Sequence, residues 1–276
     1  MDRRLLFEKI GRLVYRMTYK PRLYKYDPLK KYPKLAQKVS KKIIPESDEL
    51  YCLPNNKIVI DEEIESREMV LPTQVIDHFI DESSYRVIMN ECICRASNRC
   101  KDYPQAHGCI FIGEAARGIH PDLCREVSRE EAKEHIRKGQ EKGMINVAGK
   151  ASFDALWLDL TDDHKRLFTV CCCCPCCCIS IAVPHLSPYM TKWFVKLPGV
   201  EVTVSDDCVG CGNCEDVCVF GGIEIINNKA QILDTCMACG RCVEACQSGA
   251  LELKINDDSY VQTVIERLSN RVEVSR

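Results

Sequence analysis

The sequence predicts an α+β protein in which a small cysteine-rich α/β domain precedes a second unit built on an internal repeat. Two observations support this prediction. Between residues 58 and 195, short apolar runs alternate with amphipathic segments, which is typical of strands interleaved with helices. Between residues 208 and 246, a pattern of four cysteines occurs twice with an offset of 28 residues. At 276 residues, the chain is long enough for about two domains with buried cores.

We expect residues 1–50 to form a basic arm that begins with an amphipathic helix at 3–18. This helix would place five apolar side chains on one face: Leu6, Ile10, Leu13, Val14 and Met17. Residues 20–42 show little periodicity, and turns are expected at Pro21, Asp27-Pro28 and Pro33. Residues 1–44 carry 14 Lys/Arg and 3 Asp/Glu, a net charge of +11, whereas the rest of the chain carries −13.

This charge asymmetry leaves two interpretations of the arm open. It packs across the acidic body of its own protein or of an acidic partner, or it docks on a membrane surface as an amphipathic helix. Nucleic-acid binding is not expected, because no recognised nucleic-acid-binding fold accompanies the charge.

Residues 51–198 are predicted to form the cysteine-rich α/β domain. Proline suits the first turn of a helix, and Ser-x-x-Glu is a capping box. In chain order, the predicted elements are apolar runs at 58–60 and 69–71, a helix from Pro72 with Val75, Ile76, Phe79 and Ile80 on its buried face, a buried strand at 85–89, a helix from Gly108-Cys109 through Ala116, a helix from Ser128 to Gly143, and strands at 144–147 and 166–170.

Thirteen cysteines lie upstream of the repeat, and most of them follow two of the predicted strands. We expect both groups to lie at the same edge of the sheet, where sites on α/β sheets tend to occur. Because side chains alternate in a strand, the seven cysteines of 171–178 cannot all reach one site. The candidate metal ligands are Cys92, Cys94, Cys100, Cys109, Cys171, Cys172, Cys173, Cys174, Cys176, Cys177 and Cys178.

Within this set, the best candidate for an iron–sulfur cluster is the group Cys92, Cys94, Cys100 and Cys109. The run at 171–178 is expected to contribute ligands to that cluster or to another one. A mixture of buried thiols and a zinc site is the alternative. Cys52 and Cys124 lack spaced partners and are interpreted as structural. His107 is expected to be solvated rather than a ligand. Two arginines, Arg95 and Arg99, flank the first set and could compensate cluster charge.

The repeated pattern is C-x2-C-x2-C-x3-C, and it extends to glycines that follow at matching positions. Three cysteines two residues apart place thiolates around one corner of a cubane, and the fourth points toward a second cluster. The cysteines of the two copies are Cys208, Cys211, Cys214 and Cys218, and then Cys236, Cys239, Cys242 and Cys246.

Over residues 200–256 the chain resembles the bacterial-type two-cluster [4Fe-4S] ferredoxins. The resemblance implies a pseudo-twofold ferredoxin-like domain at 199–256 with two [4Fe-4S] clusters. It also implies that one cluster is held by Cys208, Cys211, Cys214 and Cys246, and the other by Cys236, Cys239, Cys242 and Cys218. The family usually has proline after the fourth cysteine, whereas this chain has Val219 and Gln247, which keep their backbone N–H groups. Residues 257–276 are predicted to form a closing helix that buries Val261, Val264, Ile265 and Leu268.

Cysteines at cluster-ligand spacing without a signal peptide indicate a reducing, cytoplasmic, anaerobic setting. The longest uncharged run, 167–183, is too short to span a membrane and contains Pro175, so we expect a soluble protein that is cytoplasmic or membrane-associated through its arm. No Gly-rich dinucleotide fingerprint follows a strand.

The leading functional hypothesis is a multi-cluster iron–sulfur electron-transfer protein that exchanges low-potential electrons with a redox partner. The alternative is an iron–sulfur reductase whose upstream cluster acts on a disulfide or another small substrate. A third class, an iron–sulfur assembly or storage protein, would explain the surplus cysteines but not the repeat.

Overall fold

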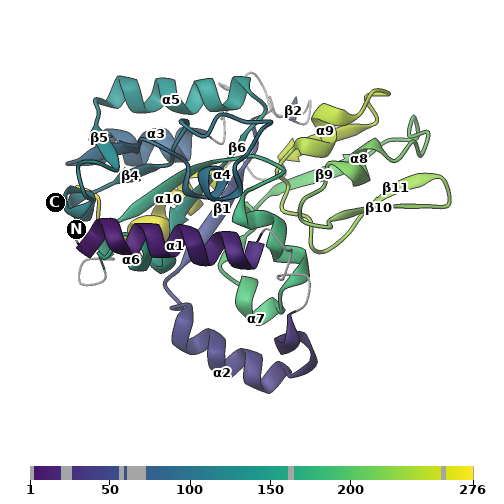
Figure 1. Ribbon diagram of the computed structural model, residues 1–276. Coiled ribbons are helices and arrows are strands. Elements are labelled where there is room, and N and C mark those ends of the chain that lie inside the picture. Colours follow the sequence, from purple (N-terminus) through teal and green to yellow (C-terminus); the bar gives the residue numbers. More distant parts are fainter. Residues whose placement is uncertain are drawn as a thin grey trace.

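The computed structural model describes residues 3–19, 27–55, 59–60, 73–160, 165–255 and 259–275. It is a mixed structure of helices and sheets, as the predicted α+β class requires (Figure 1). The predicted turn at Pro21, the apolar run at 69–71 and the helix start at Pro72 lie outside the described residues.

A seven-stranded sheet forms the centre of the upstream part. Every neighbouring pair is antiparallel except β1–β8. In spatial order the strands are β5 (Cys124–Glu126), β3 (Arg86–Met89), β4 (Ile110–Ile112), β7 (Phe168–Cys173), β6 (Ile145–Lys150), β1 (Glu49–Leu53) and β8 (Phe194–Val195).

Strands that alternate with helices usually form a parallel sheet, whereas the strands of this sheet are paired mainly antiparallel. The connection from β3 to β4 contains one helix, α4 (Ile93–Asn98). This six-residue helix is only about 9 Å long, so it is too short to carry the chain back across the sheet to start a parallel strand. The chain therefore re-enters the sheet at the edge where β3 ended. Since β4 lies between β3 and β7 and is antiparallel to both, β3 and β7 end at the same edge. The prediction that both cysteine groups share one edge is thus confirmed.

Three helices lie on one face of the sheet, where α3 (Thr73–Glu82) packs against both α5 (Arg129–Glu141) and α10 (Tyr260–Ser269) (Figure 1). The predicted apolar side chains of α3 are all buried, and Phe79 stacks on Phe168 of β7 with ring centroids 4.3 Å apart. The capping box at Ser128 and Glu131 is present. Helix α10 forms within the predicted closing segment 257–276, with Val264 and Leu268 fully buried and Val261 and Ile265 partly buried.

The N-terminal helix, α1 (Arg3–Tyr19), contacts α4 and α6 (Ser152–Trp157) and crosses in front of the sheet in Figure 1. The following segment forms the 3-10 helix η2 (Pro28–Lys31) and α2 (Pro33–Ile43), and α2 packs on α7 (Pro188–Thr191). The turn predicted at Pro33 is therefore wrong. Proline at the first helical position begins a helix instead, because its missing N–H is not needed there.

The helix predicted to open at Gly108-Cys109 is also wrong. Residues Ile110–Ile112 form the buried strand β4, and only a 3-10 turn, η3 (Glu114–Gly118), follows. A three-residue run of β-branched and aromatic side chains carries too little periodicity to distinguish a strand from a buried helix.

The C-terminal part contains two antiparallel pairings, β9 (Val200–Val204) with β12 (Leu251–Ile255) and β10 (Ile223–Ile226) with β11 (Lys229–Ile232). A short helix contains the third cysteine of each repeat: α8 (Asn213–Asp216) carries Cys214 and α9 (Arg241–Ala245) carries Cys242. A segment from far upstream, β2 (Val59–Ile60), pairs parallel with β12.

The backbone conformation of the two copies repeats at the 28-residue offset. Left-handed residues occur in matching pairs: Gly210 with Ala238, Gly212 with Gly240, and Gly221 with Gly249. Glycine adopts positive φ without steric cost, so most of these positions carry it. Ala238 adopts the same conformation with φ of 48° in the second copy. The repeat in the sequence is therefore a repeat in the backbone turns that carry the cysteines.

We expect Gly149→Ala to destabilise the fold by about 3 kcal/mol or more, the range of large core effects. Gly149 lies in β6 with φ of 149°, and an added Cβ would lie 2.0 Å from the carbonyl oxygen of Glu49 on β1. Gly143→Ala is the matched control, because Gly143 also has positive φ but no atom within 4 Å of the added Cβ. It should cost about 1 kcal/mol. Urea midpoints of both variants test this, and equal midpoints would contradict it.

Candidate metal centres

Strand β7 divides its cysteines between the two faces of the sheet. Thr169, Cys171 and Cys173 lie on one side, where Thr169 donates a hydrogen bond to Asp154 of α6 over 2.8 Å. Cys172 points to the other side, toward α5, where Gly139 lies against its sulfur. This two-residue alternation confirms that the cysteine run cannot serve a single site.

Six thiols from four segments form a closed ring at the edge of the sheet. Cys171 donates to Cys109 with a sulfur–sulfur distance of 3.3 Å, and the pKa of each member is shifted by the thiols of two neighbours. The order around the ring is Cys92, Cys94, Cys178, Cys173, Cys171, Cys109 and back to Cys92. Cys92 and Cys94 lie at the start of α4, Cys109 directly precedes β4, and Cys178 is the N-cap of the 3-10 helix η5 (Ile179–His185).

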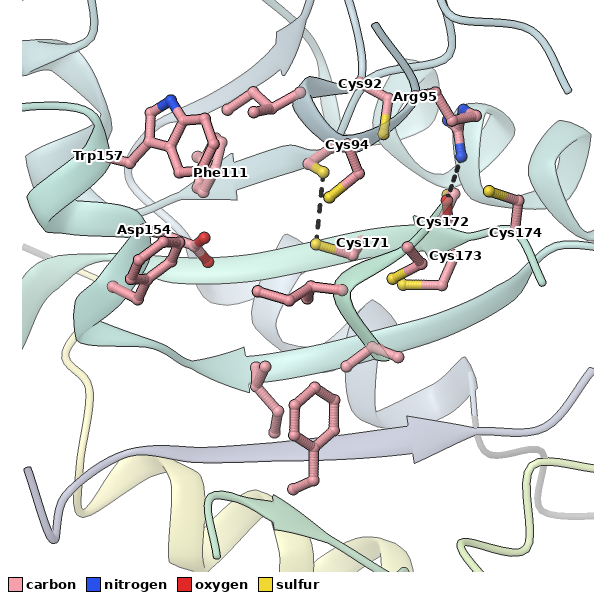
Figure 2. A pocket seen from close by; sticks show the side chains of 18 of the residues that line it. Cys92, Cys94, Arg95, Phe111, Asp154, Trp157, Cys171, Cys172, Cys173 and Cys174 are labelled. Atoms are coloured by element: carbon pink, nitrogen blue, oxygen red, sulfur yellow. Dashed lines mark hydrogen bonds between the residues drawn. The ribbon is translucent and has the colours of Figure 1, made fainter. Parts of the chain in front are cut away.

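The ring lines a cavity of about 70 Å³ (Figure 2). A water requires about 10–15 Å³ on this measure, so the space holds several water-sized groups. Figure 2 shows the labelled cysteines toward one end of the cavity and Trp157, Phe111 and Asp154 toward the other. Burial raises the pKa of Asp154 to about 6, and the hydrogen bond from Thr169 offsets part of this effect.

A second group of thiols is separate from the ring and contains Cys100, Cys174, Cys176 and Cys177. All four sulfurs lie within 4.8 Å of one another. The candidate set Cys92, Cys94, Cys100 and Cys109 is therefore divided in the structure: Cys100 joins the loop after β7, while the other three join the ring.

Cys172 lies near His107 and His135, but this trio is poorly arranged for a metal ion. The two imidazoles stack with centroids 3.7 Å apart and an interplanar angle of 8°. A metal ion must lie close to the ring plane of a histidine ligand, because the nitrogen lone pair lies in that plane. An ion midway between these rings would lie about 1.8 Å out of each plane, nearly as much as the whole metal–nitrogen distance of about 2.0–2.1 Å. Burial lowers the pKa of His107 to about 3, so His107 is a neutral packing residue and not the solvated side chain expected from the sequence.

Arg95 lies between the two thiol groups and is only 1% exposed. It donates hydrogen bonds to the backbone carbonyls of Pro104, Cys172 and His107. Burial acts to lower the pKa of its guanidinium, but the nearby thiols of Cys92, Cys174 and Cys109 raise it above its usual value. Arg95 thus provides the positive charge predicted for this site, whereas Arg99 is exposed.

The four cysteines that the resemblance assigns to one cluster line a common cavity. Cys218 of the first copy lines a cavity of about 20 Å³ together with Cys236, Cys239 and Cys242 of the second. In the first copy, Cys214 lies near Cys208 and Cys211. Cys246 precedes β12, whose first residue pairs with the last residue of β9 ahead of Cys208.

Backbone N–H groups already point at several of these sulfurs. Gly222 donates to Cys218 over 3.2 Å, Ala230 to Cys208 over 3.4 Å, and Ala238 to Cys236 over 3.4 Å. Such bonds stabilise thiolates and cluster sulfur, so the donor set and its surroundings fit a cluster.

Cys52 connects the ferredoxin-type cysteines to the ring. This β1 residue is fully buried in one apolar cluster with Cys173 and Cys178, against which Cys239 packs. Burial raises the pKa of Cys52 well above its usual value, and the thiols of Cys239 and Cys178 raise it further. Arg241, at the start of α9, donates to the carbonyl of Cys173 over 2.6 Å. Cys124 lies apart on β5, and its sulfur contacts the carbonyl oxygen of His120.

Residues 231–252 match the family model of the 4Fe-4S binding domain. This stretch contains Cys236, Cys239, Cys242 and Cys246, so the iron–sulfur and 4Fe-4S parts of the sequence prediction are confirmed. No curated protein and no solved structure matches the chain. The chain therefore contains a 4Fe-4S binding domain, and the second cluster and the upstream sites remain predictions.

We expect Cys239→Ser and Cys211→Ser each to remove about four irons per chain, because each cysteine is assigned to a different cubane. Cys124→Ser is the control, since Cys124 lies apart from both thiol groups and both ferredoxin sets. Iron and acid-labile sulfide are counted on anaerobically purified protein. Full iron content in both ferredoxin variants would refute the two-cluster assignment.

Proposed function

We propose that this protein is a multi-cluster iron–sulfur electron-transfer protein that passes low-potential electrons to or from a redox partner. The observation that carries the proposal is the shared apolar cluster in which Cys239 of the 4Fe-4S binding domain packs near Cys52, Cys173 and Cys178. Redox centres held by these two groups would be separated by a single layer of buried side chains. Electrons entering at the ferredoxin-type clusters therefore have a short route to the upstream thiols.

In this proposal the C-terminal part is a pseudo-twofold dicluster domain. Cys208, Cys211, Cys214 and Cys246 hold one cluster, and Cys218, Cys236, Cys239 and Cys242 hold the other. The repeated left-handed turns and the N–H donors to thiol sulfur support this assignment. At least one further iron–sulfur centre occupies the six-thiol ring, and the abundance of thiols favours a reducing, cytoplasmic setting.

The cavity beside the ring favours one alternative, a reductase that acts on a small substrate. A centre that only conducts electrons needs no adjoining space, whereas this cavity continues past the thiols to an aromatic wall and a carboxyl group. In this second proposal Trp157 and Phe111 would hold an apolar substrate, and Asp154 would be the nearest proton-bearing group.

Reversible reduction of the anaerobic protein tests the leading proposal. The wild-type chain should accept electrons from dithionite and return them to an oxidised viologen dye over repeated cycles, with the amount set by its cluster content. The Cys211→Ser variant should transfer fewer electrons, in proportion to its lost iron. Iron that cannot be reduced and reoxidised would refute electron transfer.

We also propose that α1 docks on an anionic membrane surface. Its predicted apolar face points away from the protein: Ile10, Leu13, Val14 and Met17 are 50–63% exposed. The inner face is polar, since Glu8 is buried and Arg12 forms an ion pair with Glu91 over 2.6 Å. An apolar stripe on a basic helix is the pattern of interfacial helices. Among the helices in the described part of the chain, none has the length and apolarity needed to cross a bilayer.

Replacement of Leu13 and Met17 by glutamine should weaken binding to anionic lipid vesicles by about tenfold or more, since each buried side chain contributes about 1.5–3 kcal/mol. Val209→Gln is the control, because Val209 is 69% exposed but lies in the ferredoxin-type part. Binding should also weaken with salt, given a Debye length of about 8 Å at physiological ionic strength. If the wild-type chain does not bind the vesicles, docking on a membrane is excluded, and docking on an acidic partner protein is the remaining interpretation of α1.

A further inference from the structure

The four thiols of Cys100, Cys174, Cys176 and Cys177 are arranged as a tetrahedron. Cys100 and Cys176 have their sulfurs 3.6 Å apart. All six sulfur–sulfur distances in the group are below 4.8 Å, so each sulfur is a close neighbour of the other three.

The size of this tetrahedron fits a single metal ion. A tetrahedral ion with metal–sulfur bonds of about 2.3 Å holds its sulfurs about 3.8 Å apart. A cubane holds its thiolates farther apart, because each one ligates a different iron. The eight ferredoxin-type cysteines, all of which are described, form no group as compact as this one. We propose that these four cysteines hold one mononuclear zinc or iron ion as a tetrathiolate site, distinct from the iron–sulfur clusters.

The backbone on both sides of the site is fixed independently of any metal. Cys100 follows the end of α4, where Arg99 adopts a left-handed conformation with φ of 51° and Cys100 donates to the carbonyl of Arg95 over 2.9 Å. A left-handed residue commonly ends a helix, and here it turns the chain so that Cys100 lies away from the helix axis. The other three ligands lie in a turn around Pro175 directly after β7.

Side-chain hydrogen bonds hold the backbone around the thiols. Asn98 joins the two segments by donating to the carbonyl of Cys177 over 3.4 Å, and Gln105 fixes the turn after α4 by donating to the carbonyl of Cys100 over 3.0 Å. Four thiolates around a divalent ion carry a net charge of −2, and the buried Arg95 lies beside Cys174 to offset it. Bonds from outer groups that orient the ligands are characteristic of metal sites.

All four coordination positions come from the chain, so the site has no open position for substrate and is structural. It ties the end of α4 to the loop after β7. The start of α4 carries Cys94 and the end of that loop carries Cys178, which contact each other in the ring. The mononuclear ion therefore positions two ring thiols without touching the ring cavity.

X-ray absorption at the zinc and iron edges, combined with metal analysis of the anaerobic full-length protein, tests the proposal. For a zinc site, we expect one zinc per chain with a single shell of four sulfurs at about 2.3 Å and no metal neighbour. For an iron site, we expect one isolated high-spin iron by Mössbauer spectroscopy, in addition to the cluster iron. Either result supports the tetrathiolate ion.

Two variants from opposite segments, Cys176→Ser and Cys100→Ser, should each lose that one ion and retain the acid-labile sulfide. Cys176 is exposed, so its replacement is the least disruptive to the fold. Cys124→Ser is the control and should retain the ion. Loss of about four irons together with sulfide would overturn the proposal in favour of a cubane. Absence of any metal beyond the clusters in the wild-type chain would overturn it altogether.

Discussion

The antiparallel position of β4 between β3 and β7 determines where the thiols of the ring and of the tetrahedral group lie. Because both outer strands end at one edge and β4 begins there, segments from residues 92–109 and 171–178 meet although at least 62 positions separate them. The alternation of β7 then assigns Cys171 and Cys173 to the ring and Cys172 to the opposite face. Neither thiol group would form if the register of β7 shifted by one residue, since such a shift exchanges the two faces.

Charge imposes the second constraint. Thiolates at the edge of an apolar core are stable only with nearby positive charge or hydrogen-bond donors. Two buried arginines meet this need: Arg95 lies between the ring and the tetrahedral group, and Arg241 joins the 4Fe-4S binding domain to the end of β7. Both are anchored through backbone carbonyls, so their positions do not depend on the protonation of any one thiol. Arg241 therefore both joins the two parts of the chain and places positive charge near the thiols at the end of β7.

The local parts of the site could be predicted from the sequence, and the non-local parts could not. The first three ferredoxin-type cysteines of each copy lie close together in the chain, so their spacing alone predicts a shared site, and the capping box at Ser128 indicates a helix start in the same way. Cys92 and Cys100 are only eight residues apart, yet α4 places them at its two ends and they join different groups. Spacing cannot show this division, because it depends on which side of the β7 loop each end of α4 meets. His107 likewise became a packing residue through its stack on His135, a contact 28 positions away in the chain.

Helix α1 links the outer surface to the interior of the site. Its inner face is closely packed, since a Cβ on Gly11 would lie 2.7 Å from the ring of Trp157, which lines the ring cavity. Arg12 on the same face reaches Glu91, the residue before Cys92. Because these contacts fix the inner face of α1, its apolar side chains face outward. Burial of each of these side chains would contribute about 1.5–3 kcal/mol of stabilising free energy. A membrane or partner that covered that stripe would bind a helix in contact with both the cavity wall and the start of α4, so docking there would act directly on the surroundings of the six-thiol ring.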